Sequence, residues 1–250
     1  MSDYEQEQDI VKVLNKRINY DEIQKKHSNV KVVKYPKQGF NYAGIINFGV
    51  RESDGEYIIQ LNNDTELLTP NWLELMVGFA QRKDVGGVGV KMYYPDETIQ
   101  HAGVIVGLGG VAGHRFKNLP KDGHAYFAKE SMIEDLSAVT AACIMNSRKV
   151  YEDVDFMDEK FAVAFNDVDF CLKIREKGYL IVYNPYIEFI HYESKSRGYE
   201  NTPEKIKRFQ GEINRFRDKW GDFVEKGDPY YNKNLEDGSE QYPIKHCKVN

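Results

Sequence analysis

Residues 57–66 read YIIQLNNDTE, and this stretch decides the fold class. Its first half, 57–61, is short, apolar and partly β-branched, which predicts a buried strand, and its second half is a polar run. Similar strand-like runs recur, with helical patterns between several of them, at 85–94, 99–106, 136–146 and 179–191. Strands that alternate with helices in one chain predict an α/β fold with a mostly parallel sheet.

Other local signals predict where further elements begin. The run 30–35 reads as a first strand, and Asn41 to Arg51 has apolar residues at helical spacing. Thr-Pro pairs at 69–70 and 202–203 each predict a helix start, because a hydroxyl can cap the helix and Pro suits its first position. The second of these helices has a single apolar stripe, which favours packing onto the domain over a coiled-coil dimer.

Composition limits the protein classes. The chain has 250 residues with 41% hydrophobic and 29% charged residues, which is typical of a globular protein. A net charge of −5 and a pI near 5.8 argue against a nucleic-acid binder. No apolar run approaches the ~20 residues of a transmembrane helix, and the charged N-terminus does not resemble a signal peptide. The three cysteines lack metal-type spacing, so we expect a cytoplasmic protein without zinc.

The polar run after the first buried strand is the first candidate site. Ligands of open α/β sheets bind beyond the carboxyl ends of strands, which is where Asn62, Asn63 and Asp64 lie. The Asp64 carboxylate suits Mg²⁺ or Mn²⁺, which complete their coordination shell with phosphate oxygens. Spacing alone slightly favours the alternative, a polar loop whose side chains cap turns.

A second candidate begins at Asn166, which resembles an N-cap that Asp169 could complete as a capping-box-like pair. Asp167 is not needed for capping. A helix N-terminus would hold its carboxylate ionised, as a general base requires, although the same field weakens its basicity. Structural and functional interpretations of Asp167 are about equally supported.

The third candidate is His191, which follows the last predicted strand. A lone histidine is more often structural, but Lys195 and Arg197 follow it in a Ser- and Gly-containing loop that could hold diphosphate oxygens. Taken alone, a solvated charged loop is the better interpretation. A glycine-rich segment from Gln100 to His114 is not a dinucleotide fingerprint, and we give it little weight as a strand and flexible loop near an acceptor site.

Together these segments resemble family 2 glycosyltransferases of the GT-A fold, in the branch of bacterial enzymes that build O-antigen, rhamnan or other cell-surface polysaccharides. The resemblance covers roughly residues 35–235 in order. It rests on LNNDTE (61–66), WLELM (72–76), VGGVGVKMYYPDETIQHAG (85–103), SAVTAACIM (137–145), FNDVDFCLKIREKGY (165–179), HYESKSRG (191–198) and GDPYYNKNL (227–235).

The resemblance implies a role for the first site. Asn62-Asn63-Asp64 takes the family's D-x-D position, with Asp64 as the metal ligand and Asn62 near the ribose of a nucleotide sugar. His191 would be a second contact to Mn²⁺ or Mg²⁺. Asparagine replaces the first acid of the motif, while the metal-binding carboxylate is kept.

The resemblance also implies the remaining roles. Asp167 would be the general base of an inverting transfer, and Lys195 or Arg197 would hold the leaving diphosphate. The implied domains are a charged helical segment at 1–30, a partial GT-A catalytic domain at 31–200, and an amphipathic helix with a tail at 201–250. The donor would be a nucleotide sugar, and the acceptor a glycan or lipid-linked glycan. The protein itself would be cytoplasmic or peripheral at the inner face of a membrane.

The family's first two strands, which hold the nucleoside, have no counterpart before residue 30. We therefore expect an N-terminally truncated sheet with an exposed edge, to be covered by a second copy, a partner chain or the N-terminal helix. Two alternatives to an autonomous enzyme stay open. One is a catalytically incomplete module that binds a sugar or a partner without transfer, and the other, less favoured, is a metal-dependent hydrolase.

Overall fold

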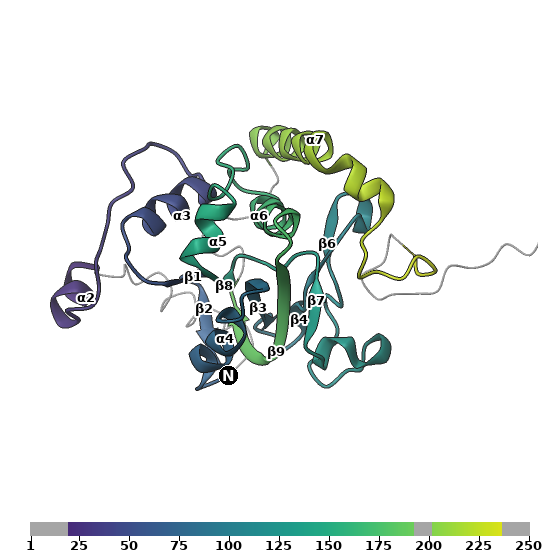
Figure 1. The fold of residues 1–250 in the computed structure, drawn as a ribbon, viewed down its shortest axis with the longest axis horizontal. Helices are drawn as coiled ribbons and strands as arrows, with labels where there is room; N and C mark the ends of the chain where they lie inside the picture. The colour runs from purple at the N-terminus through teal and green to yellow at the C-terminus, as the bar shows by residue number, and fades with distance from the viewer. Residues whose placement is uncertain (1–19, 193–201, 237–250) are drawn as a thin grey trace, which may run out of the picture. The chain divides into compact units, whose positions relative to one another are not determined.

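The computed structural model describes residues 20–192 and 202–236 of the chain (Figure 1). The chain divides into two compact units, residues 1–38 and 39–250. The first contains α2 (Tyr20–Lys26), and the backbone N–H of Val32 donates to Oε1 of Gln24 at 2.9 Å. The strand predicted over 30–35 is wrong: no described strand pairs with this run, and Val32 and Val33 stay exposed.

The second unit has the alternating strands and helices that the sequence predicts. Its strands are β1 (Tyr57–Leu61), β2 (Thr65–Leu67), β3 (Val85–Tyr93), β4 (Ile99–His101), β5 (Val104–Val106), β6 (Ala112–His114), β7 (Glu134–Leu136), β8 (Cys143–Ser147) and β9 (Leu180–His191). Its helices are α3 (Tyr42–Arg51), α4 (Trp72–Ala80), α5 (Arg148–Asp153), α6 (Asn166–Glu176) and α7 (Pro203–Lys226), with 3-10 turns η1 (Leu108–Gly110) and η2 (Tyr126–Ser131).

The central sheet has the order β1-β8-β3-β9-β2, with β4 paired to β3 and β7 to β9. The α/β class is confirmed, but the expectation of a mostly parallel sheet is wrong, because only β3 and β9 pair in parallel among the described strands. The reason is that β8 is inserted antiparallel between β1 and β3. Strands β1, β3 and β9 still run in one direction, so their carboxyl ends lie at the same edge of the sheet.

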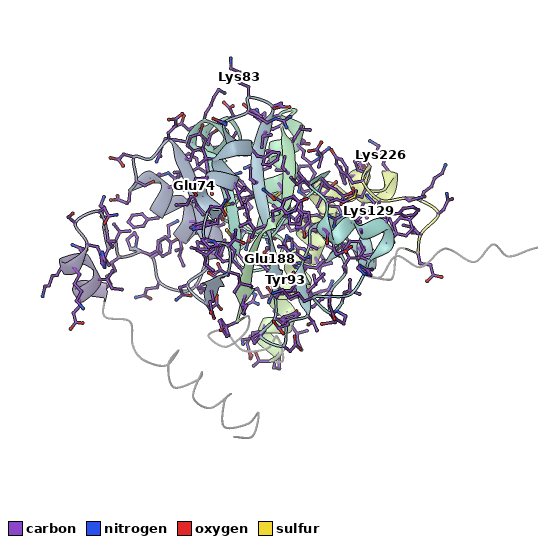
Figure 2. The ribbon with its side chains drawn as sticks, turned by 90° about the horizontal axis from the view of Figure 1, so that it is seen from below. Glu74, Lys83, Tyr93, Lys129, Glu188 and Lys226 are labelled. Atoms are coloured by element: carbon purple, nitrogen blue, oxygen red, sulfur yellow. The ribbon has the colours of Figure 1, made fainter. Side chains whose placement is uncertain are left out.

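Helices cover both faces of this sheet (Figure 1). Met76 of α4 packs on one face with Val88, Val90 and Met92 of β3. Residues of α3 and α6 pack on the other face, in a core that also contains Ile144 of β8. Lateral contacts between strands add polar links, such as the bond of 2.7 Å that the Tyr93 hydroxyl donates to Glu188 (Figure 2).

Two of the predicted helix starts are confirmed. The Asn41 side chain accepts from the N–H of Gly44 at the start of α3, and the Thr202 side chain accepts from Lys205 at the start of α7. The start predicted at Thr69 is wrong, because the Thr69 hydroxyl bonds Tyr186 and Glu188 of β9 and α4 begins only at Trp72. Among the helices described, none has the combination of length and apolar character that crossing a bilayer requires.

Candidate functional site

The candidate site forms where the carboxyl ends of β1 and β9 meet the beginning of β8. The chain leaves β1 at Leu61, which is opposite Cys143 of β8, and the N–H of Asn62 donates to the carbonyl of Ala142 at 2.9 Å. Strand β2 then pairs antiparallel with β9, with Thr65 opposite His191. This pairing carries the polar run 62–64 across the strand ends and brings it to His191.

Asp64, Asn62 and His191 converge on one atom, the Nε2 of the His191 ring. Asp64 Oδ1 lies 3.2 Å and Asn62 Nδ2 3.3 Å from it. The N–H of Tyr192 also donates to the Asp64 carbonyl at 2.8 Å, which fixes this loop to the end of β9. The hydrogen bond from His191 is the main cause that lowers the pKa of Asp64, so the carboxyl is ionised at neutral pH.

Gln100 of β4 sets the orientation of the His191 ring. The Gln100 Nε2 donates to the His191 carbonyl at 3.1 Å. The Gln100 Oε1 therefore lies 2.7 Å from His191 Nδ1 and accepts a hydrogen bond from its N–H. With Nδ1 donating to Gln100, Nε2 is the ring atom that faces the Asp64 carboxylate. It can hold a proton that hydrogen-bonds Asp64, or give up that proton and offer its lone pair to a metal ion that the carboxylate also binds.

The other residues predicted for the donor site are Asn63, Lys195 and Arg197. Asn63 is exposed to solvent. Lys195 and Arg197 lie outside the described residues, so their role stays a prediction. Within the described ranges, no three His, Cys, Asp or Glu side chains gather closely enough to hold a metal ion by themselves. A site with only Asp64 and His191 would suit an ion that takes its other ligands from water or phosphate.

Asp167 lies in the first turn of α6 and is linked to the same strand end. Its Oδ1 accepts from the N–H of Val168 at 2.9 Å and its Oδ2 from Ala141 at 3.4 Å. Burial raises the pKa of Asp167, although these bonds and one from Thr140 act in the opposite direction. The prediction from the sequence considered only the effect of the helix N-terminus on the Asp167 carboxyl, and this effect favours the ionised form. Burial outweighs it and makes the carboxylate a better proton acceptor.

The helix start before Asp167 differs from the prediction. Phe165, not Asn166, has the N-cap position, and its φ of 60° lies in the left-handed region that non-glycine residues rarely adopt. Asn166 is the first helical residue and donates to the Val163 carbonyl at 2.7 Å. Asp169 does not complete a capping box, because its Oδ1 accepts from Trp220 Nε1 at 2.8 Å and Lys219 Nζ at 2.6 Å.

Helix α7 holds this strained start of α6 in place. Buried Glu212 accepts from the backbone N–H groups of Val163 at 2.9 Å and Ala164 at 3.2 Å. The Phe165 ring stacks on Phe209 with centroids 5.7 Å apart and packs against Phe216. The amphipathic helix thus packs onto the domain, as its apolar stripe predicts, and it does so next to Asp167.

Two functional features escaped the sequence analysis. Tyr42 of α3 donates to the Ala141 carbonyl at 2.9 Å, and burial, followed by the charge of Asp167, raises its pKa. Gln100 belongs to the segment 100–114, to which we gave little weight. Strand β3 pairs with both β4 and β9, and its pairing with β9, which brings Gln100 to His191, is a long-range contact that local patterns do not encode.

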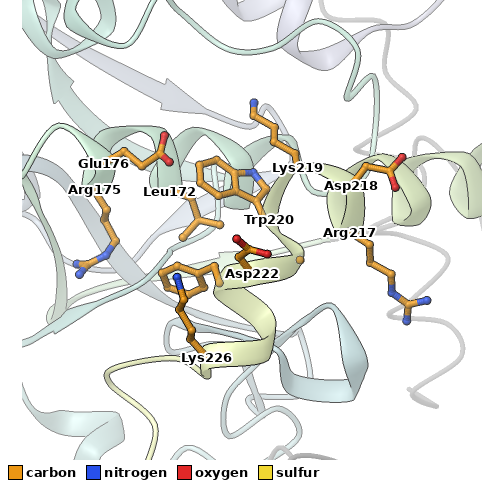
Figure 3. Close-up of a pocket in the computed structure, with 11 residues that line it drawn as sticks. Leu172, Arg175, Glu176, Arg217, Asp218, Lys219, Trp220, Asp222 and Lys226 are labelled. Carbon is orange, nitrogen blue, oxygen red and sulfur yellow. The ribbon is translucent and has the colours of Figure 1, made fainter.

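A cavity of about 540 Å³ lies between α6 and α7, away from these residues (Figure 3). Leu172 and Trp220 line it, and its other walls are mainly charged. The cations are Arg175, Arg217, Lys219 and Lys226, and the carboxylates are Glu176, Asp218 and Asp222. Asp64, Asp167 and His191 do not line it. Because opposite charges are mixed around it, the cavity selects no class of ligand.

A family model and two curated proteins match this chain. The family model "Glycosyl transferase family 2" matches residues 15–154. The chain is 46% identical over 199 residues to the uncharacterized protein y4gI of Sinorhizobium fredii, covering 78% of this chain and 22% of that protein. It is 36% identical over 209 residues to the O-antigen biosynthesis protein RfbC of Myxococcus xanthus, covering 78% and 15% respectively. The chain thus spans less than a quarter of the length of either relative.

The fold also matches a solved structure. A crystal structure of GalNAc-T7 with UDP, GalNAc and Mn²⁺ superposes with a TM-score of 0.60 over 85% of this chain and 40% of that one. The identity is 12%, so this likeness concerns the fold.

Proposed function

Because the chain belongs to glycosyltransferase family 2, whose model matches more than half of it, we propose that it transfers a sugar from a nucleotide sugar to a glycan hydroxyl with inversion. The observation that supports this most is the convergence of two groups on the segment 140–142. The loop carrying Asp64 bonds the Ala142 carbonyl, and Asp167 accepts from Ala141. A donor-binding group and a proton acceptor therefore share one sheet edge.

Asp64 and His191 are the residues that we assign to a divalent metal, Mn²⁺ or Mg²⁺. Their fit rests on His191 Nε2 facing the ionised Asp64 at 3.2 Å. A bound divalent ion would neutralise charge on the leaving diphosphate. Gln100 keeps the imidazole oriented for this role, and Asn62 Nδ2 lies 3.3 Å from the same nitrogen. Lys195 and Arg197 would add positive charge from the following loop.

Asp167 takes the proton of the attacking hydroxyl in this proposal. Attack on the anomeric carbon and departure of the nucleoside diphosphate occur on opposite faces, which gives inversion. The bonds from Val168 and Ala141 hold the carboxylate in one orientation, and its raised pKa matches the task of a base.

The proposal extends to the partners. The acceptor would be a glycan or lipid-linked glycan of a cell-surface polysaccharide, handled in the cytoplasm or at the inner membrane face. Strand β1 pairs only with β8 among the described strands, so a second copy or a partner chain could cover its other edge. Light scattering coupled to size exclusion tests the second copy, and a monomer at all concentrations would contradict it.

Titration calorimetry with UDP, dTDP and GDP, with and without Mn²⁺, tests the donor site. We expect Mn²⁺-dependent binding of at least one diphosphate, lost in Asp64→Asn and kept in the exposed control Asp122→Asn. A donor-hydrolysis assay then tests Asp167→Asn, which should bind normally but lose turnover. Binding without any turnover by the unmodified protein would favour the incomplete module, and unchanged turnover in Asp167→Asn would refute the base assignment.

A further inference from the structure

Two histidines that the proposed reaction does not use lie beside the site. His101, fully buried at the end of β4, and His114, partly buried at the end of β6, have their Nδ1 atoms 2.8 Å apart. Their rings meet edge to face with centroids 5.0 Å apart. His101 Nε2 lies 3.3 Å from the backbone N–H of Thr140, which donates to it.

These contacts fix the protons on both rings. Because His101 Nε2 accepts from Thr140, its one proton is on Nδ1 and is donated to His114 Nδ1. His114 therefore carries its own proton on Nε2. A second proton on either ring would place two N–H groups against each other, so the contacts favour two neutral imidazoles. Burial is the largest cause that lowers the pKa of both rings, that of His114 to about 4.

The Thr140 end of this pair belongs to the segment on which the site is built. Thr140 and Ala141 both hydrogen-bond the Asp167 carboxylate. The carbonyl of Ala141 accepts from Tyr42, and that of Ala142 from Asn62. The Thr140 N–H donates to none of these partners, and His101 accepts from it.

We propose that His101 and His114 are positioning residues: a neutral imidazole pair that holds the segment 140–142 in the orientation that hydrogen-bonds Asp167. The proposal rests on the proposed role of Asp167 for its functional meaning. A neutral pair suits this task, because an imidazolium at His101 could not accept from the N–H of Thr140.

The first experiment reads the protons directly on the metal-free protein. Long-range ¹H–¹⁵N correlation spectra of ¹⁵N-histidine-labelled protein assign the tautomers, with single His→Gln variants identifying each ring and exposed His124→Gln as the control. We expect His101 protonated on Nδ1 and His114 on Nε2, both neutral from pH 8 to about pH 5.5. The opposite tautomers, or an imidazolium in this range, would overturn the proposal.

The second experiment follows the Asp167 carboxyl carbon during a pH titration. In His101→Leu, Asp167 should bind its proton about tenfold more tightly, as expected if hydrogen bonding worth about 1.4 kcal/mol to its ionised form is lost. His101→Gln should stay within about twofold, because its amide oxygen can replace Nε2 as the acceptor. A purely structural histidine would show no such difference between two folded variants.

His114 provides a second pair of variants if His101→Leu does not fold. His114→Asn keeps an acceptor for His101 Nδ1, whereas His114→Leu removes it, so only the leucine variant should change the Asp167 titration. An unchanged titration in a folded leucine variant would refute the positioning role. Neither experiment needs turnover, so a failure of the base assignment, seen with Asp167→Asn, remains distinguishable from a failure of this inference.

Discussion

Replacing Gly89 of β3 with alanine should destabilise the protein and disturb the site. A Cβ at this position would lie 2.6–2.7 Å from three atoms of Val139, which directly precedes the segment 140–142. To restore an ordinary contact distance, Val139 or strand β3 would have to move by about 0.7 Å. Val139 cannot easily do so, because its side chain is fully buried and stiff at χ1. Overpacking of this kind costs about 1–3 kcal/mol.

Gly87, two residues earlier on the same strand, gives a matched control. A Cβ there would meet atoms at 3.0–3.2 Å, all at the ends of the side chains of Ile181, Asn146 and Ile144. Both substitutions reduce the freedom of the unfolded chain equally, so this gain cancels in the comparison. The difference between the two variants therefore isolates the contact with Val139.

Thermal unfolding followed by circular dichroism measures this difference. A loss of about 2 kcal/mol corresponds to a melting temperature about 4–8 °C lower in a chain of this size, and Gly89→Ala should show it relative to Gly87→Ala. Donor hydrolysis should fall only in Gly89→Ala, because the shift of Val139 reaches Thr140. Equal melting temperatures in the two variants would show that β3 moves freely relative to Val139 and would refute the reasoning.

Three further predictions concern single side chains. Burial raises the pKa of Asp167 above its unfolded value of 3.8, so the ionised carboxyl lowers the stability of the fold as the pH rises through the folded-state pKa. Asp167→Asn should therefore have a higher melting temperature than the unmodified protein at pH 7–8. This difference should vanish below about pH 4. Gln100→Leu should weaken Mn²⁺ binding about 10–100-fold by freeing the His191 ring, measured by paramagnetic resonance titration, and unchanged affinity would contradict the ring-orienting role. Glu212→Ala should lower the free energy of unfolding in urea by about 1–3 kcal/mol, because two backbone amides lose their acceptor, with Glu212→Gln losing less.

Local patterns predicted the elements that the residues specify by themselves. The strand over 57–61, of which only Ile58 and Gln60 are buried, and the helices that begin after Asn41 and Thr202 follow from hydrophobic spacing and capping chemistry. Thr69 shows the limit of this reasoning. Its hydroxyl could cap a helix, but the neighbouring strand β9 offers partners for the same hydroxyl. Capping propensity is local, whereas this competition depends on tertiary structure.

The sequence indicated Asp64, Asp167 and His191 as separate candidates but not how they are arranged. Asp64 and His191 are far apart in the sequence and meet because β2 returns antiparallel beside β9. The direction of the change in the pKa of Asp167 depends on burial, which the sequence does not give. Gln100 and the segment 140–142 were missed for a similar reason, since they act through a ring orientation and through backbone groups that carry no sequence signature.

The support that α7 gives to α6 has a consequence for protein synthesis. The strained Phe165 and the carboxylate of Asp169 find their partners only on a helix that ends at Lys226. A ribosome adding about 5–20 residues per second exposes α6 several seconds before the whole of α7. During that interval the turn that carries Asp167 lacks the contacts from α7. The growing polypeptide would thus complete the loop proposed to bind the donor before the turn that carries the proposed proton acceptor.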